Sequence, residues 1–168
     1  YKCTYLTYIS LPPQLSTIKY NAFDNCNNLS LINNESPLKL YFGTEQHGKV
    51  AYYAKNIITS DKTQFKEIGD YLFKINEDST EINLIRYIGN DSIINLPQSF
   101  FERKYKIESN AFFANKTIRE VNFSEGVTEI GHSAFYECEN LAFISFSDSL
   151  KKIDKKALTV TLAPSSTQ

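Results

Sequence analysis

The stretch VTEIGHSAFYECENLAFISFSDSLKKIDKKAL, residues 127–158, decides the fold because one pattern occurs in it twice at a spacing of 23 residues. Ile130 and Ile153 each stand four residues before an alanine, which is followed by phenylalanine in the first copy and by leucine in the second. The segments LTYISLPPQLSTIKYNAFDNCNNL (6–29) and KIESNAFFANKTIREVNF (106–123) carry the same pattern. Chance could produce one such pair, but not several copies in phase, so the sequence indicates a structural repeat.

A unit of 23 residues is too short to bury its own apolar face, so consecutive units are expected to stack as a solenoid. Alternating apolar residues predict a first buried strand in each unit, and a second apolar pair predicts another extended segment. The small alanine is expected at the point where neighbouring coils pack closely, and the phenylalanine is expected to fill the space between coils. The predicted first-strand columns are Leu6/Ile9/Leu11, Ile118/Val121/Phe123 and Leu141/Ile144/Phe146, and the second-segment pairs are Leu15/Ile18, Val127/Ile130 and Leu150/Ile153.

The unit resembles the BspA-like class of leucine-rich repeats, whose pattern reads L-x-x-I-x-I-P-x-x-V-x-x-I-G-x-x-A-F-x-x-C-x-x. The match covers roughly half of the chain and is carried by the three segments quoted above. The expected fold is therefore a leucine-rich-repeat solenoid, α/β horseshoe-like, of strands with short helical turns, interrupted by a β-rich insertion. The resemblance implies a microbial protein that is secreted or displayed at the cell surface, in a family where several members are implicated in adhesion.

The repeat fails in the middle of the chain, which predicts the following organisation: repeats over 1–40, a non-repeat β-rich insertion over 41–90, repeats over 91–163 and a flexible tail over 164–168. Strand and turn signals predict an antiparallel meander from about Tyr71 to Pro97, whose last strand re-enters the solenoid. QSFFERKY (98–105) contains a four-residue insertion in one repeat. The 41–90 segment can be read either as a separate β-subdomain, the favoured interpretation, or as a decayed pair of repeats. The opening residues read as the middle of a longer protein.

The cysteines and histidines do not form a pattern typical of catalysis or metal binding. Cys3, Cys26 and Cys138 occupy one repeat slot that faces the core, so buried thiols are the favoured reading, although Cys3 and Cys26 would lie on adjacent coils, close enough for a disulfide bond. His132 stands six residues before Cys138, but in a slot predicted to face solvent. The sequence therefore predicts no catalytic residue, no metal site, no cofactor and no enzyme activity.

What remains is the surface, where the outward positions of the first strands are predicted to align as a ladder across the coils. The predicted partner-binding face comprises Tyr8, Ser10, Arg119, Glu120, Asn122, Phe143 and Ser145, with Ser147 beside them. Exposed aromatic residues among small polar ones are typical of protein-binding surfaces. The 41–90 insertion is a second candidate surface, and a third interpretation is that the outward residues simply contact water.

The favoured function is a non-enzymatic, adhesin-like module, extracellular or at the cell surface, that binds a protein or glycan partner such as the host extracellular matrix. The alternative is a structural spacer without a ligand of its own. The net charge is −1, and the 22% of charged residues are of mixed sign, so the sequence shows no basic surface of the kind that binds nucleic acid. It also contains no apolar run long enough to span a membrane. Open solenoid ends would permit self-association through exposed strand edges.

Overall fold

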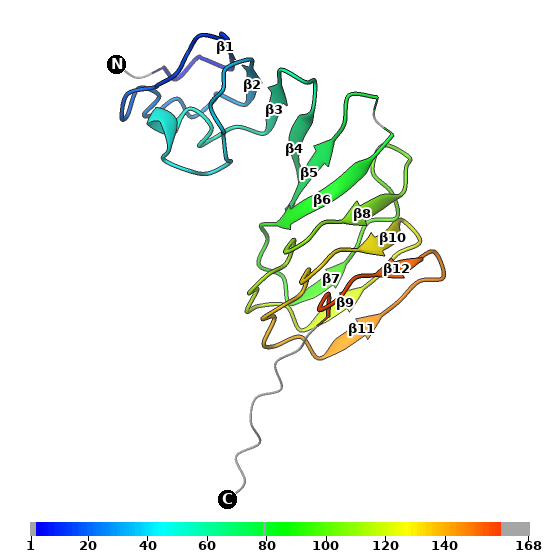
Figure 1. Ribbon diagram of the computed structural model, residues 1–168. Helices are drawn as coiled ribbons and strands as arrows, with labels where there is room; N and C mark the ends of the chain where they lie inside the picture. Colours follow the sequence, from blue (N-terminus) through cyan, green and yellow to red (C-terminus); the bar gives the residue numbers. More distant parts are fainter. Residues whose placement is uncertain (1–2, 79, 159–168) are drawn as a thin grey trace, which may run out of the picture. The chain divides into compact units, whose positions relative to one another are not determined.

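The computed structural model describes residues 3–78 and 80–158, which consist almost entirely of strands and turns (Figure 1). Among these residues the one helical segment is the 3-10 helix η1, His47–Lys49. The short helical turns expected from the sequence are therefore hydrogen-bonded turns in the structure. The chain divides into two compact units, Tyr1–Ile68 with Ile75–Thr80, and Gly69–Lys74 with Glu81–Gln168. The predicted tail, 164–168, lies outside the described residues.

The first unit stacks parallel strands at the repeat spacing. Its strands are β1 (Tyr8–Leu11), β2 (Leu31–Asn34), β3 (Asn56–Thr59) and β4 (Gln64–Ile68). Ile9, Ile32 and Ile57 stand level with one another in the parallel register of β1, β2 and β3, whereas β4 runs antiparallel to β3. The core of this unit is built from one fully buried cluster: Leu11, Cys26, Leu29, Ile32, Val50, Ala51, Ala54 and Ile57.

The second unit has two sheets, because each repeat contributes one strand to each. Its strands are β5 (Tyr71–Ile75), β6 (Ile82–Tyr87), β7 (Ile93–Asn95), β8 (Tyr105–Ile107), β9 (Glu120–Asn122), β10 (Val127–Ile130), β11 (Phe143–Ser145) and β12 (Lys152–Ile153). One sheet has the order β5-β6-β8-β10-β12 in this unit, and the other has the order β11-β9-β7 (Figure 1). The pairings β6-β8, β8-β10, β10-β12, β7-β9 and β9-β11 are all parallel.

The Ala-Phe turns join neighbouring coils by hydrogen bonds as well as by packing. The backbone N–H of Phe112 donates to the carbonyl of Ala134, and that of Phe135 donates to the carbonyl of Ala157, each at 2.8 Å. Ala111, Ala134 and Ala157 are buried. The small side chain is needed because a larger one would hold the two backbones apart, as the sequence predicted. Ala22 differs, since it is exposed in the first unit.

A column of stacked aromatic rings runs beside these turns. The rings of Phe112 and Phe135 lie 4.5 Å apart at an interplanar angle of 11°, and Tyr87 stacks on the other face of the column, 5.5 Å from Phe112. Both phenylalanines are fully buried. Tyr87 extends the column into β6, a position where the sequence showed no Ala-Phe pair.

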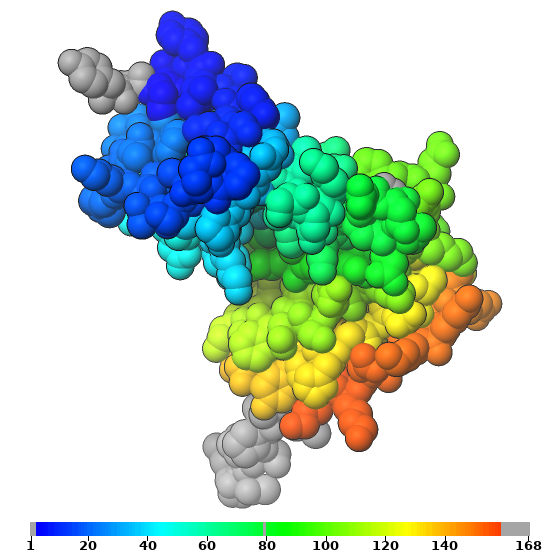
Figure 2. Space-filling model, turned by 45° about the horizontal axis from the view of Figure 1, so that its top comes forward, coloured from blue at the N-terminus to red at the C-terminus, as the bar shows by residue number. Residues whose placement is uncertain are grey.

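Not every predicted core residue is buried. Phe146 is 51% exposed and Ile153 is 46% exposed, and Ile144 is half-buried. The reason is that β11 and β12 are the last strands of their sheets, so no further described coil covers them. Figure 2 shows this coil, in orange and red, as an open edge of the second unit. Leu6, Ile9, Leu15 and Ile18 of the first unit are half-buried for the same reason, since β1 is also an edge strand.

The predicted antiparallel meander needs correction. Ile88, just after β6, donates its N–H to the carbonyl of Asp70, just before β5, so these two strands run in opposite directions as expected. However, β6 runs parallel to β8, and β7 pairs with β9 in the other sheet. The meander is therefore limited to the hairpin, and β7 re-enters the solenoid at the position predicted for it. Within 41–90, β3 pairs parallel with β2 and β6 pairs parallel with β8. The domain boundaries, and the choice between a separate subdomain and decayed repeats, stay predictions.

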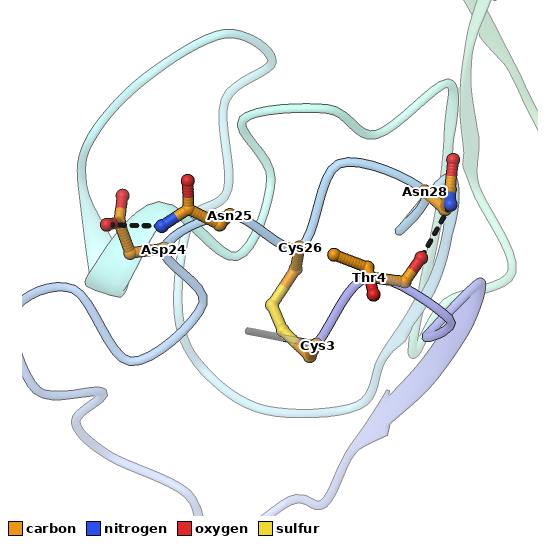
Figure 3. Close-up of a disulfide and its surroundings, with 6 residues drawn as sticks. All are labelled: Cys3, Thr4, Asp24, Asn25, Cys26 and Asn28. Atoms are coloured by element: carbon orange, nitrogen blue, oxygen red, sulfur yellow. Dashed lines mark hydrogen bonds between the residues drawn. A yellow bond between two sulfur atoms is a disulfide. The ribbon is translucent and has the colours of Figure 1, made fainter. Parts of the chain in front are cut away.

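The preference for free buried thiols is wrong for one pair. Cys3 and Cys26 form a disulfide with Cα atoms 4.7 Å apart, 23 residues apart in sequence (Figure 3). The repeat places two cysteines in the same slot of adjacent coils, and their Cα separation falls in the range that a disulfide requires. Next to the bond, the amide of Asn28 donates to the carbonyl of Thr4 at 2.5 Å, so the two coils are also joined by a hydrogen bond.

Candidate interaction surface

The three-stranded sheet β7-β9-β11 presents one row of side chains to the core and two to the outside. Ile94, Val121 and Ile144 stand level and face inward, the first two fully buried. The outward rows are Ile93, Glu120 and Phe143 in one register position, and Asn95, Asn122 and Ser145 in the next. Because the strands are parallel and in register, equivalent positions of successive repeats become neighbours on the surface.

The row of Asn95, Asn122 and Ser145 is joined by hydrogen bonds between its own side chains. Nδ2 of Asn122 donates to Oδ1 of Asn95 at 3.1 Å and to Oε1 of Glu120 at 2.8 Å. Oγ of Ser145 donates to Oδ1 of Asn122 at 2.7 Å. This polar row stabilises the stacking of the repeats, and much of its hydrogen-bonding capacity is used within the sheet.

The row of Ile93, Glu120 and Phe143 is different because its two outer members are apolar and exposed. Phe143 is 69% exposed and Ile93 is 52% exposed, and they flank Glu120. Exposed aromatic rings among polar residues are typical of protein-binding surfaces, although single exposed apolar residues are also common on protein surfaces. Arg119 is exposed immediately before β9, where its carbonyl accepts the N–H groups of Ala142 and Phe143.

The structure divides the predicted face into two ladders. Tyr8 and Ser10 lie on β1 of the first unit, level with Leu31 and Asn33 of β2. Nδ2 of Asn33 donates to Oγ of Ser10 at 3.2 Å, so the first unit has a polar row of the same kind. The other predicted residues, Arg119, Glu120, Asn122, Phe143 and Ser145, are brought together in the second unit. Sequence reasoning missed Ile93 and Asn95, although Asn95 precedes Asn122 by 27 residues, the 23-residue period plus the four-residue insertion.

Two side chains that could be reactive, the thiol of Cys138 and the imidazole of His132, lie in different environments. Cys138 is buried, its Sγ donates to the carbonyl of Phe112 at 3.1 Å, and burial raises the pKa of its thiol to about 11. A thiol with such a pKa is protonated at neutral pH and a poor nucleophile. His132 is exposed, in the slot where the sequence placed it. Within 3–78 and 80–158, no group of three or more His, Cys, Asp or Glu residues is arranged to hold a metal ion. Over the same ranges, no helix is long and apolar enough to cross a membrane.

The chain has partial matches among solved structures of bacterial proteins, with TM-scores below 0.5 in the three described here. A leucine-rich repeat protein from Bacteroides capillosus is 20% identical, with a TM-score of 0.45 over 54% of this chain and 88% of that one. The T. pallidum leucine-rich repeat protein is 25% identical, with a TM-score of 0.48 over 52% and 42% of the two chains. The pneumococcal vaccine antigen PcpA is 23% identical, with a TM-score of 0.43 over 86% of this chain and 40% of that one. The chain thus spans less than half of the latter two proteins.

The family follows from the repeat itself. The chain matches the model of the BspA type leucine-rich repeat region, in six copies, over residues 1–103 and 92–163. No curated protein matches it. The family model covers nearly the whole chain, and the stacked strands, buried isoleucine columns and Ala-Phe turns are the structural form of the pattern read from the sequence. The chain therefore belongs to the BspA-type leucine-rich-repeat family, as the sequence predicted.

Proposed function

We propose that this chain is a non-enzymatic, adhesin-like module that binds a partner protein outside the cell through the outward face of β7-β9-β11. The observation that carries the proposal is the pair of exposed apolar side chains, Phe143 and Ile93, held in register on either side of Glu120. Exposed aromatic residues on rigid strands supply contact area at a low cost in conformational entropy. Asn122 and Ser145 are hydrogen-bonded to each other, so they give the face a polar surface with a fixed conformation.

An extracellular or cell-surface location is supported by chemistry as well as by family. The disulfide between Cys3 and Cys26 belongs in an oxidising compartment, because cytosolic thiols are generally kept reduced. The likeness to BspA-type repeats points the same way.

The test is a binding screen against extracellular-matrix proteins, mucins and a glycan array, with the unmodified chain immobilised. Phe143→Ala should weaken binding at least about fivefold, since truncating an aromatic contact that matters for binding costs more than about 1 kcal/mol. Phe113→Ala is the matched control, because Phe113 is 48% exposed but lies on a turn away from this sheet. If Phe143→Ala binds as well as the unmodified chain, the binding site is not on the β7-β9-β11 face. The Tyr8→Ser variant and changes in the 41–90 segment would then be tested. Binding only to glycans would change the partner class, and no binding at all would favour the spacer.

A further inference from the structure

The connection between β7 and β8 is longer than the equivalent connection in the next coil. Leu96 and Ile107 are separated by 11 positions, whereas Phe123 and Ile130, which occupy the same repeat slots one coil later, are separated by seven. The shorter connection is therefore enough to join the two sheets. The four additional residues are not required by the repeat, which raises the question of what they do.

The additional residues close on themselves as a tight β-hairpin. The N–H of Phe100 donates to the carbonyl of Arg103 at 3.0 Å, and the N–H of Arg103 donates to the carbonyl of Phe100 at 2.9 Å. Phe101 and Glu102 form the turn between them, with φ angles of 49° and 59°. Two-residue hairpins with positive φ at both central residues are common, but glycine, asparagine and aspartate are the residues that form them readily.

The side chains at this turn oppose its backbone conformation. A bulky residue such as Phe101 is rare at positive φ, because its Cβ atom approaches the following carbonyl oxygen. Positive φ also occurs at Asn110, Ser133 and Lys156, but these residues are 23 apart and share one slot of the repeat. The turn of Phe101 and Glu102 belongs to no such slot. Backbone strain that the fold does not require indicates a function for the residues that carry it.

The base of the hairpin is fixed to the second unit. Phe100 is buried, with its ring 3.8 Å from that of Phe73 and 4.9 Å from that of Tyr105, and both of these are fully buried. Directly after the hairpin, Nζ of Lys104 donates to Oγ of Ser149 at 2.6 Å. Because the base is held in this way, the side chains at the tip lose little conformational entropy when they contact another molecule.

The tip presents one aromatic ring between charges of both signs. Phe101 is 53% exposed, and the two residues that follow it, Glu102 and Arg103, are exposed as well. A carboxylate beside the ring opposes entry into a lipid bilayer, and a single ring supplies too little apolar area to bind a membrane surface. An aromatic residue surrounded by polar groups is instead the usual composition of an anchor at a protein interface.

We propose that Phe101 inserts into an apolar pocket of a partner protein, with Glu102 and Arg103 contacting charged groups at the rim of that pocket. The inference rests on the function proposed above for the class of partner. It deepens that function by naming an aromatic anchor outside the β7-β9-β11 face and by stating the chemistry that the partner must offer, an apolar pocket wide enough for a phenyl ring.

The first experiment measures binding of the immobilised chain to fibronectin, laminin, collagen and mucin. Phe101→Ala should weaken binding at least about fivefold, whereas Phe113→Ala, at a phenylalanine of similar exposure on another turn, should leave it unchanged. Loss of binding in Phe143→Ala but not in Phe101→Ala would overturn this inference and leave the proposed face intact. Loss in Phe101→Ala alone would support the hairpin and exclude the proposed face. A chain that binds none of the four proteins would overturn both.

Two further measurements separate the ring from its backbone and the protein partner from a membrane. Glu102→Gly relieves the positive φ but keeps the ring, so it should raise Tm by about 2–4 °C and retain binding. Glu108→Gly, at a residue without positive φ, should lower Tm. An unchanged or lower Tm in Glu102→Gly would overturn the argument from strain. Binding to phosphatidylglycerol vesicles that is lost in Phe101→Ala would overturn the assignment to a protein partner.

Discussion

The aromatic column is the part of the structure whose contribution can be worked out most directly. In the Phe135→Ala variant, a side chain that is 1% exposed is lost from between two coils, together with its stack on Phe112 and its edge contact with Phe123 at 6.0 Å. Deletion of a fully buried phenylalanine costs about 3–5 kcal/mol, because the cavity left behind collapses only in part. The hydrogen bond from the Phe135 N–H to the Ala157 carbonyl holds the backbone in place, which limits that collapse.

The measurement is urea unfolding, followed by circular dichroism and by the NMR signals of Val121 and Ile130, which report on the second unit. With a slope of about 1–3 kcal/mol per molar urea, the midpoint should fall by about 1 M or more. Phe113→Ala is the control, since Phe113 also stacks on a neighbour, Tyr136, at 5.9 Å but is 48% exposed. It should cost no more than about 1.5 kcal/mol. Equal midpoints for the two variants would refute the argument that the Phe112–Phe135 column is the core of the repeat.

Three further results are expected. Reduction of the Cys3–Cys26 bond should lower the stability of the first unit by about 3 kcal/mol, seen as a lower urea midpoint in dithiothreitol, and a Cys3→Ser/Cys26→Ser variant should no longer respond to the reductant. Burial raises the pKa of the Cys138 thiol from 9.0 to about 11, so the unfolded chain loses this proton first as the pH rises. The free energy of unfolding should therefore fall between about pH 9 and 11. A Cys138→Ala variant whose stability falls equally over this range would contradict the assignment. Asn122→Ala removes three side-chain hydrogen bonds, to Asn95, Glu120 and Ser145, and should cost about 1–2 kcal/mol, more than Asn95→Ala, which removes one; thermal unfolding of the two variants gives the comparison.

Much of the fold follows from periodicity, because a stacked coil repeats its contacts wherever the period is kept. Ile107, Ile130 and Ile153 stand level on three strands for this reason. Leu84 belongs to the same column, 23 residues before Ile107, yet it escaped notice because the residues around it lack the Ala-Phe pair. Its neighbour Tyr87 takes the place of the phenylalanine in the ring stack. When a different side chain fills the same space, the packing between coils is kept, but the Ala-Phe pattern can no longer be recognised in the sequence.

Other features depend on what the pattern does not encode. The period placed Cys3 and Cys26 on adjacent coils, but whether two neighbouring thiols are oxidised depends on their distance and on the redox compartment, not on spacing. Burial at the ends of a stack depends on what covers the outermost coil, so Phe146 and Phe123 occupy the same repeat slot with different exposure. For the candidate surface, the sequence identified Phe143 and Asn122, whereas Ile93 required knowledge of which strand lies beside β9.

A stacked repeat also constrains which charges can stand next to one another on its surface. Every outward position has a neighbour one strand spacing away in the same slot of the next repeat, so equal charges in one slot repel and opposite charges attract. Lys106, Glu129 and Lys152 alternate in sign along one such row, where Lys106 is paired with Glu129, and Lys152 is paired with Asp154 of the next row. In the next row, Gly131 stands between Glu108 and Asp154, so these two carboxylates are not in equivalent positions of adjacent coils. The glycine is required at this position, because a Cβ atom at Gly131 would lie 2.6 Å from the backbone N of Ser109 and would push the two coils apart.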